Sequence, residues 1–223
     1  MIKNKLAILG LGSRTTSFYL KNLNKIYNRE KGGFSTCPFL LLNADFNTIN
    51  SLLPYVSEKL DNAVSQYTNQ INSLKVDSLL VPNITLHKTI DRLTISQNII
   101  HPVHLSIKKI KENKWKKVVL FGSLFSMKSD YIKNQFKANN IEVILPNEED
   151  MVFIDEVRKQ IYDEIETDDL IKKYHSIIYK YSEENPVILS CTELSILKPK
   201  EHKMLLDMAE IQMEGAIHQV LVD

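Results

Sequence analysis

The feature that most constrains the fold is a unit that occurs twice in the chain. A short apolar run leads into a glycine turn and then into a stretch with helical spacing, once around Gly10 and once around Gly122. Each half later has a second apolar run that ends in polar residues, at Asn83 and at Cys191. About seventy residues separate glycine from polar cluster in both halves, the length of a small α/β unit. Alternating strands and helices predict parallel sheets.

The sequence therefore predicts an α/β fold of two pseudo-symmetric lobes, each a mainly parallel sheet flanked by helices. We expect the first lobe to comprise residues 1–98 plus a C-terminal helix over 208–223, and the second to comprise 99–207. Ligands bind at the carboxyl ends of parallel strands and favour inter-domain clefts. The prediction is one cleft between the lobes, lined by four strand-end residues: Gly10, Asn83, Gly122 and Cys191.

Apolar periodicity places the individual elements. Helical faces are expected at Ala63 to Leu74, at Ile154 to Ile165 and at Leu170 to Tyr181, and one helix is expected through Tyr131 and Phe136. Further expected elements are strands over 38–43, 76–82 and 141–145, a helix over 15–26, and a last helix over 208–221.

Composition excludes several classes of function. The 223 residues are 43% hydrophobic and 25% charged with a net charge of +1, which gives no basis for binding nucleic acid or an anionic membrane. No segment resembles a signal peptide or a membrane span, so the expected location is the cytoplasm. The two cysteines, Cys37 and Cys191, are far apart, and His101 and His104 lack a carboxylate cluster, so no metal site is expected.

Cys191 stands at the end of the apolar run over 187–189. If a helix follows, its N-terminal amides would favour a thiolate; the alternative is a small buried hydrophobic residue. The turn from Gly10 to Gly12 is typical of a carboxylate or phosphate cradle. It lacks the third glycine of a dinucleotide fingerprint, and no Walker lysine motif is present, so neither a nucleotide nor pyridoxal phosphate is expected as a cofactor.

The chain resembles the aspartate/glutamate racemase superfamily, the cofactor-independent amino-acid racemases, over nearly its whole length. Gly32-Gly33 followed by residues 40–46 is closer to the broad-specificity branch than to the strict aspartate branch. The resemblance rests on Ile8-Leu9-Gly10, the two strand-end clusters, Phe121-Gly122-Ser123 with Ser126-Met127 and Asp130-Tyr131, Ile161-Tyr162-Asp163-Glu164 and, most specifically, Cys191-Thr192-Glu193-Leu194.

The resemblance implies an active site between two lobes and a chemistry in which two acid/base groups exchange the Cα proton from opposite faces. Cys191 matches the base of the second lobe, and Asn83 falls at the position of the base in the first. The family usually has cysteine there and the close branch has threonine, whereas asparagine cannot take up a proton at neutral pH. The resemblance also implies a homodimer.

The same resemblance implies that backbone amides and side-chain hydroxyls bind the carboxylate of the substrate. No arginine occurs between Arg29 and Arg92, so a dicarboxylate substrate lacks its expected anchor, and a small amino acid or carboxylate is expected. The hydroxyls could equally bond to their own backbone, and Glu193 is either a helix-start carboxylate or an amine partner. The expected binding residues are Gly10, Gly12, Thr85, Ser123, Thr192 and Glu193.

Three functions remain open. The first is a racemase or epimerase with Cys191 as the acid/base. The second is a lyase or decarboxylase of the same superfamily, which protonates a planar intermediate with a single cysteine. The third is an inactive paralogue that binds an amino acid or a partner protein. Asn83 favours the second and third, and the retained Cys191-Thr192-Glu193-Leu194 cluster favours an enzyme.

Overall fold

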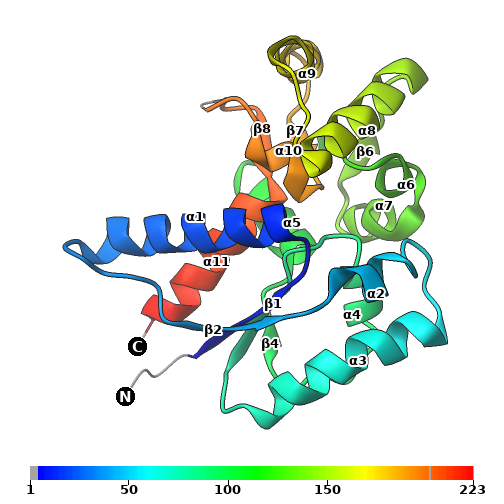
Figure 1. Ribbon diagram of the computed structural model, residues 1–223. Coiled ribbons are helices and arrows are strands. Elements are labelled where there is room, and N and C mark those ends of the chain that lie inside the picture. The colour runs from blue at the N-terminus through cyan, green and yellow to red at the C-terminus, as the bar shows by residue number, and fades with distance from the viewer. Residues whose placement is uncertain (1–4, 201, 223) are drawn as a thin grey trace. The chain divides into compact units, whose positions relative to one another are not determined.

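The computed structural model describes residues 5–200 and 202–222 (Figure 1). The chain divides into two compact units, Met1–His101 with Gln212–Asp223 and Pro102–Ile211. The first unit contains β1 (Leu6–Gly10), α1 (Ser13–Lys31), β2 (Phe39–Asn43), α2 (Phe46–Asn50), α3 (Glu58–Ser73), β3 (Ser78–Leu80), α4 (His87–Ile90) and β4 (Asn98–Ile99).

The second unit contains α5 (Pro102–Glu112), β5 (Lys117–Phe121), α6 (Leu124–Lys128), α7 (Asp130–Lys137), β6 (Glu142–Ile144), α8 (Glu148–Asp163), α9 (Asp168–Ser182), β7 (Val187–Leu189), α10 (Thr192–Ile196) and β8 (Leu205–Asp207). The last helix, α11 (Met208–Leu221), begins in this unit and ends in the first, because the boundary between the units falls after Ile211.

Each unit holds one four-stranded parallel sheet, and the strand order is the same in both. The orders are β2-β1-β3-β4 and β6-β5-β7-β8, with every pairing parallel. In both sheets the strand that comes first in the sequence is central and precedes a glycine-containing turn. The predicted α/β fold of two parallel sheets flanked by helices is therefore confirmed.

Helix starts in both units are fixed by short polar side chains that accept a backbone amide. Ser57 accepts from Leu60 at the start of α3, and Asn147 accepts from Asp150 at the start of α8. Such caps satisfy an amide that has no partner inside the helix and contribute about 1 kcal/mol each. They explain why these helices begin where the polar residue precedes the apolar pattern.

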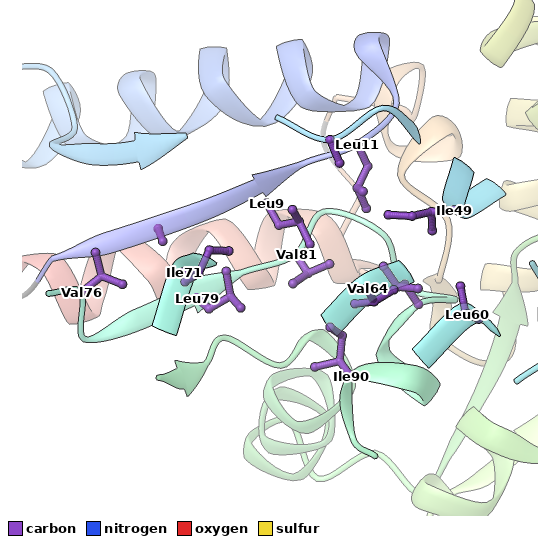
Figure 2. Close-up of a cluster of buried hydrophobic side chains, with 13 residues drawn as sticks. Leu9, Leu11, Ile49, Leu60, Val64, Ile71, Val76, Leu79, Val81 and Ile90 are labelled. Carbon is purple, nitrogen blue, oxygen red and sulfur yellow. The ribbon is translucent and has the colours of Figure 1, made fainter. Parts of the chain in front are cut away.

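The central strands are apolar on both faces, as expected of parallel sheets that are covered by helices. Every residue of β1 is buried, and so is every residue of β3 and β7. Figure 2 shows the core of the first unit, where side chains from β1, β3 and α3 pack together. Its labelled members are Leu9, Leu11, Ile49, Leu60, Val64, Ile71, Val76, Leu79, Val81 and Ile90.

One helix prediction was confirmed and another was wrong in detail. The helix expected through Tyr131 and Phe136 is α7, and a separate short helix, α6, precedes it, because Ser129 has extended backbone angles of φ −71° and ψ 158° between the two. Ile165 was expected on the face of α8, but Glu164 adopts a left-handed conformation with φ 58° that ends the helix. The Ile165 side chain is 63% exposed.

Candidate active site

The polar residues singled out from the sequence lie at the carboxyl edge of each sheet. In the first unit β1 pairs with β3, so Gly10 and the turn with Asn83 follow neighbouring strands. In the second unit Phe121 pairs with Leu189, which places Gly122 and Cys191 beyond the same edge. Each unit thus brings its own two clusters together, and one site built from all four stays a prediction.

The two strand-end glycines are required for the same structural reason, which is that neither position has room for a Cβ atom. A Cβ on Gly10 would lie 2.5 Å from Oδ1 of Asn43, and a Cβ on Gly122 would collide with Oγ of Ser190. In both units a polar side chain from the neighbouring strand therefore lies directly against the glycine backbone. Any larger residue at either position would displace that side chain.

The turn after β1 leads directly into α1. Gly12 is the N-cap of α1 and offers no side chain, so no side-chain cap bond is made there. Backbone amides at such a helix start favour anions. Leu11 is not part of this cradle, because its amide already donates to Oγ1 of Thr16 at 3.0 Å.

Asn83 has a local structural role at the end of β3. Its Oδ1 accepts from the amide of Leu86 at 3.0 Å, just before α4, while its own amide donates to Val81 O at 2.9 Å. Asn83 and Thr85 are partly exposed, whereas Ile84 between them is buried. Among the described residues, no hydrogen bond engages the Nδ2 group of Asn83, which could donate to a ligand.

A buried polar network lies behind this turn. His87 Nε2 is 3.2 Å from Val81 O and must carry the proton, because a carbonyl only accepts. Gln212, at 0% exposure, donates to Ile100 O at 2.7 Å and to Val81 O at 3.3 Å, and accepts from Tyr19 Oη at 2.7 Å. His87 therefore holds the backbone just before the Asn83 turn, and Gln212 attaches α11 to the same backbone.

Cys191 lies at the end of β7 as the N-cap residue of α10, and its side chain is partly exposed. Its Sγ donates to Oε2 of Glu193 at 2.8 Å. Burial raises the pKa of the Cys191 thiol well above its ordinary value, the Glu193 carboxylate raises it further, and the positive charge of Arg158 only partly opposes them. The helix that was expected to favour a thiolate is present but has only five residues, and burial together with the Glu193 carboxylate raises the pKa and so favours the protonated thiol.

The hydroxyls of the second unit differ in their partners. Ser123 caps α6, where its Oγ accepts from the Ser126 amide at 3.0 Å and lies 2.9 Å from Oγ of Ser126. It thus bonds to its own turn, the alternative considered for such hydroxyls. Thr192 is 4% exposed, and within the described part of the chain its Oγ1 has no hydrogen-bond partner. A buried hydroxyl of this kind is costly unless something accepts or donates to it.

The parallel-sheet fold of both units agrees with what comparisons of the sequence and of the structure with known proteins found. The sequence profile of the Asp/Glu/hydantoin racemase family matches residues 8–215. The chain belongs to this family. No curated protein matches the chain in sequence.

Solved structures similar to this family member share its fold. A candidate Asp/Glu racemase from Yersinia pestis superposes with a TM-score of 0.82 at 22% identity, covering 98% of this chain and 100% of the other. An aspartate racemase homologue from Pyrococcus horikoshii gives 0.80 at 17% identity, with 97% and 99% covered. The aspartate racemase of Picrophilus torridus gives 0.75 at 16%, with 97% and 94% covered.

The sequence did not reveal the ion pair of Arg158 with Asp155, whose charge acts on Cys191 in this racemase-family chain. Arg158 on α8 donates from Nε to Asp155 Oδ1 at 3.0 Å, and Asp155 also accepts from the Leu124 amide at 3.0 Å, next to Ser123. The charge of Arg158 acts on Cys191 and on Glu193. In the sequence the pair has the i, i+3 spacing of many surface helices, so only the packing of α8 on α10 reveals it.

Two negative findings bear on the site. In the described part of the chain, no group of three or more His, Cys, Asp or Glu side chains could hold a metal ion. Among the described helices, none is long and apolar enough to cross a membrane.

Proposed function

We propose that the chain is an amino-acid racemase or epimerase that transfers a proton at Cα without pyridoxal phosphate, with Cys191 as the acid/base and Asn83 at the position of the opposing base. The observation that carries the proposal is the hydrogen bond of 2.8 Å from Cys191 Sγ to Glu193 Oε2 at the end of β7. Membership of the Asp/Glu/hydantoin racemase family supports the same reaction class.

The environment of Cys191 favours its action as a proton donor. Because its pKa is raised by burial and by Glu193, the thiol carries a proton at neutral pH that it can deliver to a planar carbanion. Once the proton has left, the thiolate lies near the positive charge of Arg158, which lowers its pKa and so stabilises the anion. In the reverse direction, Glu193 accepts the thiol proton first, and the resulting thiolate then acts as the base that removes the Cα proton.

The substrate in this proposal is a small amino acid or carboxylate. The amides that begin α1 at Gly12 and the Thr192 hydroxyl, which has no partner among the described residues, supply donors for its carboxylate. Gly10, Thr85 and Ser123 complete the proposed binding set, and Glu193 is its acidic member. A homodimer in the cytoplasm, acting without a cofactor, belongs to the same proposal.

A second candidate is a single-cysteine lyase or decarboxylase. Asn83 favours it, because an amide does not titrate and its Oδ1 is already bonded to the Leu86 amide. A reaction that only protonates one face of an intermediate needs Cys191 alone. An inactive paralogue that binds its ligand without turnover is the third candidate, and the same experiment separates all three.

The experiment follows α-proton exchange by NMR while a panel of L-amino acids is incubated with the protein in deuterated water, and chiral chromatography measures inversion. Exchange with inversion supports the racemase, and exchange with retention shows one working base. A parallel incubation with a malonate-type substrate, in which the release of carbon dioxide is measured, identifies the lyase. No turnover of any candidate leaves the inactive paralogue.

Two variants make the result specific. Cys191→Ala is expected to lower the exchange rate by about 10²–10⁴-fold, because one acid/base group is removed. Cys37→Ala is the matched control, since Cys37 is a buried thiol before β2 and is expected to leave the rate unchanged. Racemisation that survives Cys191→Ala would overturn the proposal.

A further inference from the structure

The second unit has a depression at the edge of its sheet opposite Cys191. It consists of two adjoining hollows that share Lys116, Asn140 and Ile141 where β5 and β6 begin, and Trp115 lines one of them. Its lysines come from α5, the turn between α5 and β5, β5 and α7. Cys191 follows the other end of the neighbouring strand β7. Because β5 is five residues long, about 15 Å of sheet separates the depression from that edge.

The depression has a large excess of positive charge. Six lysines line it, and three of them are engaged: Lys111 donates to Asn139 Oδ1, Lys117 pairs with Glu142, and Lys133 pairs with Asp130. Among the described residues, no ion pair or hydrogen bond engages the ammonium groups of the other three, Lys114, Lys116 and Lys137.

The ends of two helices weaken this field but do not cancel it. The helices α5 and α7 both end beside the depression, and a helix carboxyl end carries about half a negative charge. Two such ends and the carboxylates of Glu142 and Asp130, which pair with Lys117 and Lys133, offset about three of the six lysine charges. A net positive charge of about three therefore remains within one small surface region.

The wall of the depression also offers a ring and two hydrogen-bonding groups. Trp115 is half-buried, so one part of its indole is anchored while another part faces the depression. In the described structure no hydrogen bond engages the indole N–H of Trp115 or the side-chain amide of Asn140. An aromatic ring beside unpaired lysines can stack a flat ring and hold phosphates at once.

We propose that this depression binds a nucleoside di- or triphosphate, with the base against Trp115 and the phosphates on Lys114, Lys116 and Lys137. Lysines bind phosphate as point charges, and the depression contains no arginine fork of the kind that suits a single planar carboxylate. The ligand is not a cofactor of the proposed reaction, because it would lie at the opposite edge of the sheet from Cys191.

Trp115 is the only tryptophan of the chain, so its fluorescence reports on the depression alone. Titration of the full-length protein with adenosine triphosphate is expected to quench this fluorescence saturably, and inorganic tripolyphosphate is expected to compete. Raising the salt concentration should weaken binding, because the lysines are exposed. The double variant Lys114→Ala/Lys116→Ala is expected to bind about tenfold more weakly.

The matched control is Lys21→Ala/Lys25→Ala, which removes two exposed charges from α1 in the other unit. Unchanged affinity in this control together with the loss in the first double variant supports the proposal. Equal loss in both variants would show attraction by overall charge alone and overturn it. Quenching by adenosine as strong as that by the triphosphate, or no saturable quenching, would also overturn it.

Discussion

Cys191 is subject to two opposing charges whose effects can be separated one residue at a time. Glu193 raises the pKa of the thiol and Arg158 lowers it. Glu193→Gln should therefore lower the pKa, increase the thiolate fraction at neutral pH and speed alkylation by iodoacetamide, while Arg158→Met should slow it. A shift of one pKa unit changes the thiolate fraction about tenfold. Mass spectrometry of labelling rates between pH 7 and pH 9, roughly one unit on either side of a free thiol's pKa, measures both changes.

Cys37 provides the internal reference for that experiment. Burial raises the pKa of Cys37 to about 12, and its side chain is only 6% exposed. Cys191 is partly exposed, so it is expected to react first in the unmodified protein although its pKa is also raised. Faster labelling of Cys37, or identical rates in the Glu193→Gln and Arg158→Met variants, would contradict the assignment of Cys191 as the reactive thiol.

Among the elements, α8 is anchored by Asp155. Burial alone would raise the pKa of this carboxyl, but Lys159, the Leu124 amide and Arg158 together lower it below its ordinary value of 3.8. A depressed pKa stabilises the fold above the unfolded value, and this contribution is lost as pH falls through the folded pKa. Asp155→Asn should therefore lower the free energy of unfolding by about 1–2 kcal/mol at pH 7 and by less near pH 3, below the ordinary pKa of the carboxyl.

Urea unfolding of wild type and variant at both pH values measures this difference. Asp169→Asn is the control, because Asp169 is 94% exposed and pairs with Lys172 on the surface of α9. Exposed pairs of this kind contribute about 0–1 kcal/mol. An effect of Asp155→Asn that is equally large in acid would show that lost packing, rather than lost charge, destabilises α8.

Helix α11 is held by Gln212 in the core of the first unit. Replacing it by leucine leaves Ile100 O without the amide that now donates to it at 2.7 Å, and Tyr19 Oη without its acceptor. Gln212→Leu should lower the free energy of unfolding by about 2–3 kcal/mol. Chemical denaturation monitored by circular dichroism measures the change, and Glu214→Gln on the same helix, where the side chain is exposed, should change the free energy of unfolding by about 0.5 kcal/mol or less.

Elements with a long apolar pattern were predictable from the sequence, and very short ones were not. The last helix was expected over 208–221 and is α11, Met208–Leu221. Strands β4 and β8 were missed, because two and three residues are too few to show a pattern. Their place is fixed by pairing with β3 and β7, which only the folded chain reveals.

The position of a site residue was predictable where it follows from the order of the strands. Its chemical environment was not predictable where it depends on the packing of other elements. Placing Cys191 at a strand end followed from the apolar run before it, and the structure has it just after β7. The direction in which its pKa shifts did not follow, because that depends on burial, on Glu193 and on Arg158 from another helix. The hydrogen bonds of Gln212 to Val81 and Ile100 join segments far apart in the sequence, so only the folded chain reveals them.

For the whole molecule, the central fact is that two units have one strand order but carry different polar groups at the corresponding strand ends. The turn after β3 carries a bonded amide at Asn83, and the turn after β7 carries a thiol at Cys191. In the proposed reaction the first lobe therefore lacks an acid/base group, although its fold is intact. Restoring such a group tests whether the chain is a racemase limited by one residue.

Two variants restore such a group, Asn83→Thr and Asn83→Cys. Asn83→Thr is the more informative one, because a threonine hydroxyl can replace Asn83 Oδ1 as acceptor for the Leu86 amide, whereas a cysteine thiol is a weaker acceptor. If substrate binding and Cys191 are already in place, either variant should raise racemisation by up to about 10²–10⁴-fold, the usual contribution of one general acid/base group. Chiral chromatography across an amino-acid panel measures the change.

If the chain is a single-cysteine lyase, the same variants should leave its reaction unchanged or slow it, and the double variant Asn83→Thr/Cys191→Ala should show no inversion in either case. Inversion in that double variant would remove Cys191 from every mechanism considered for this chain.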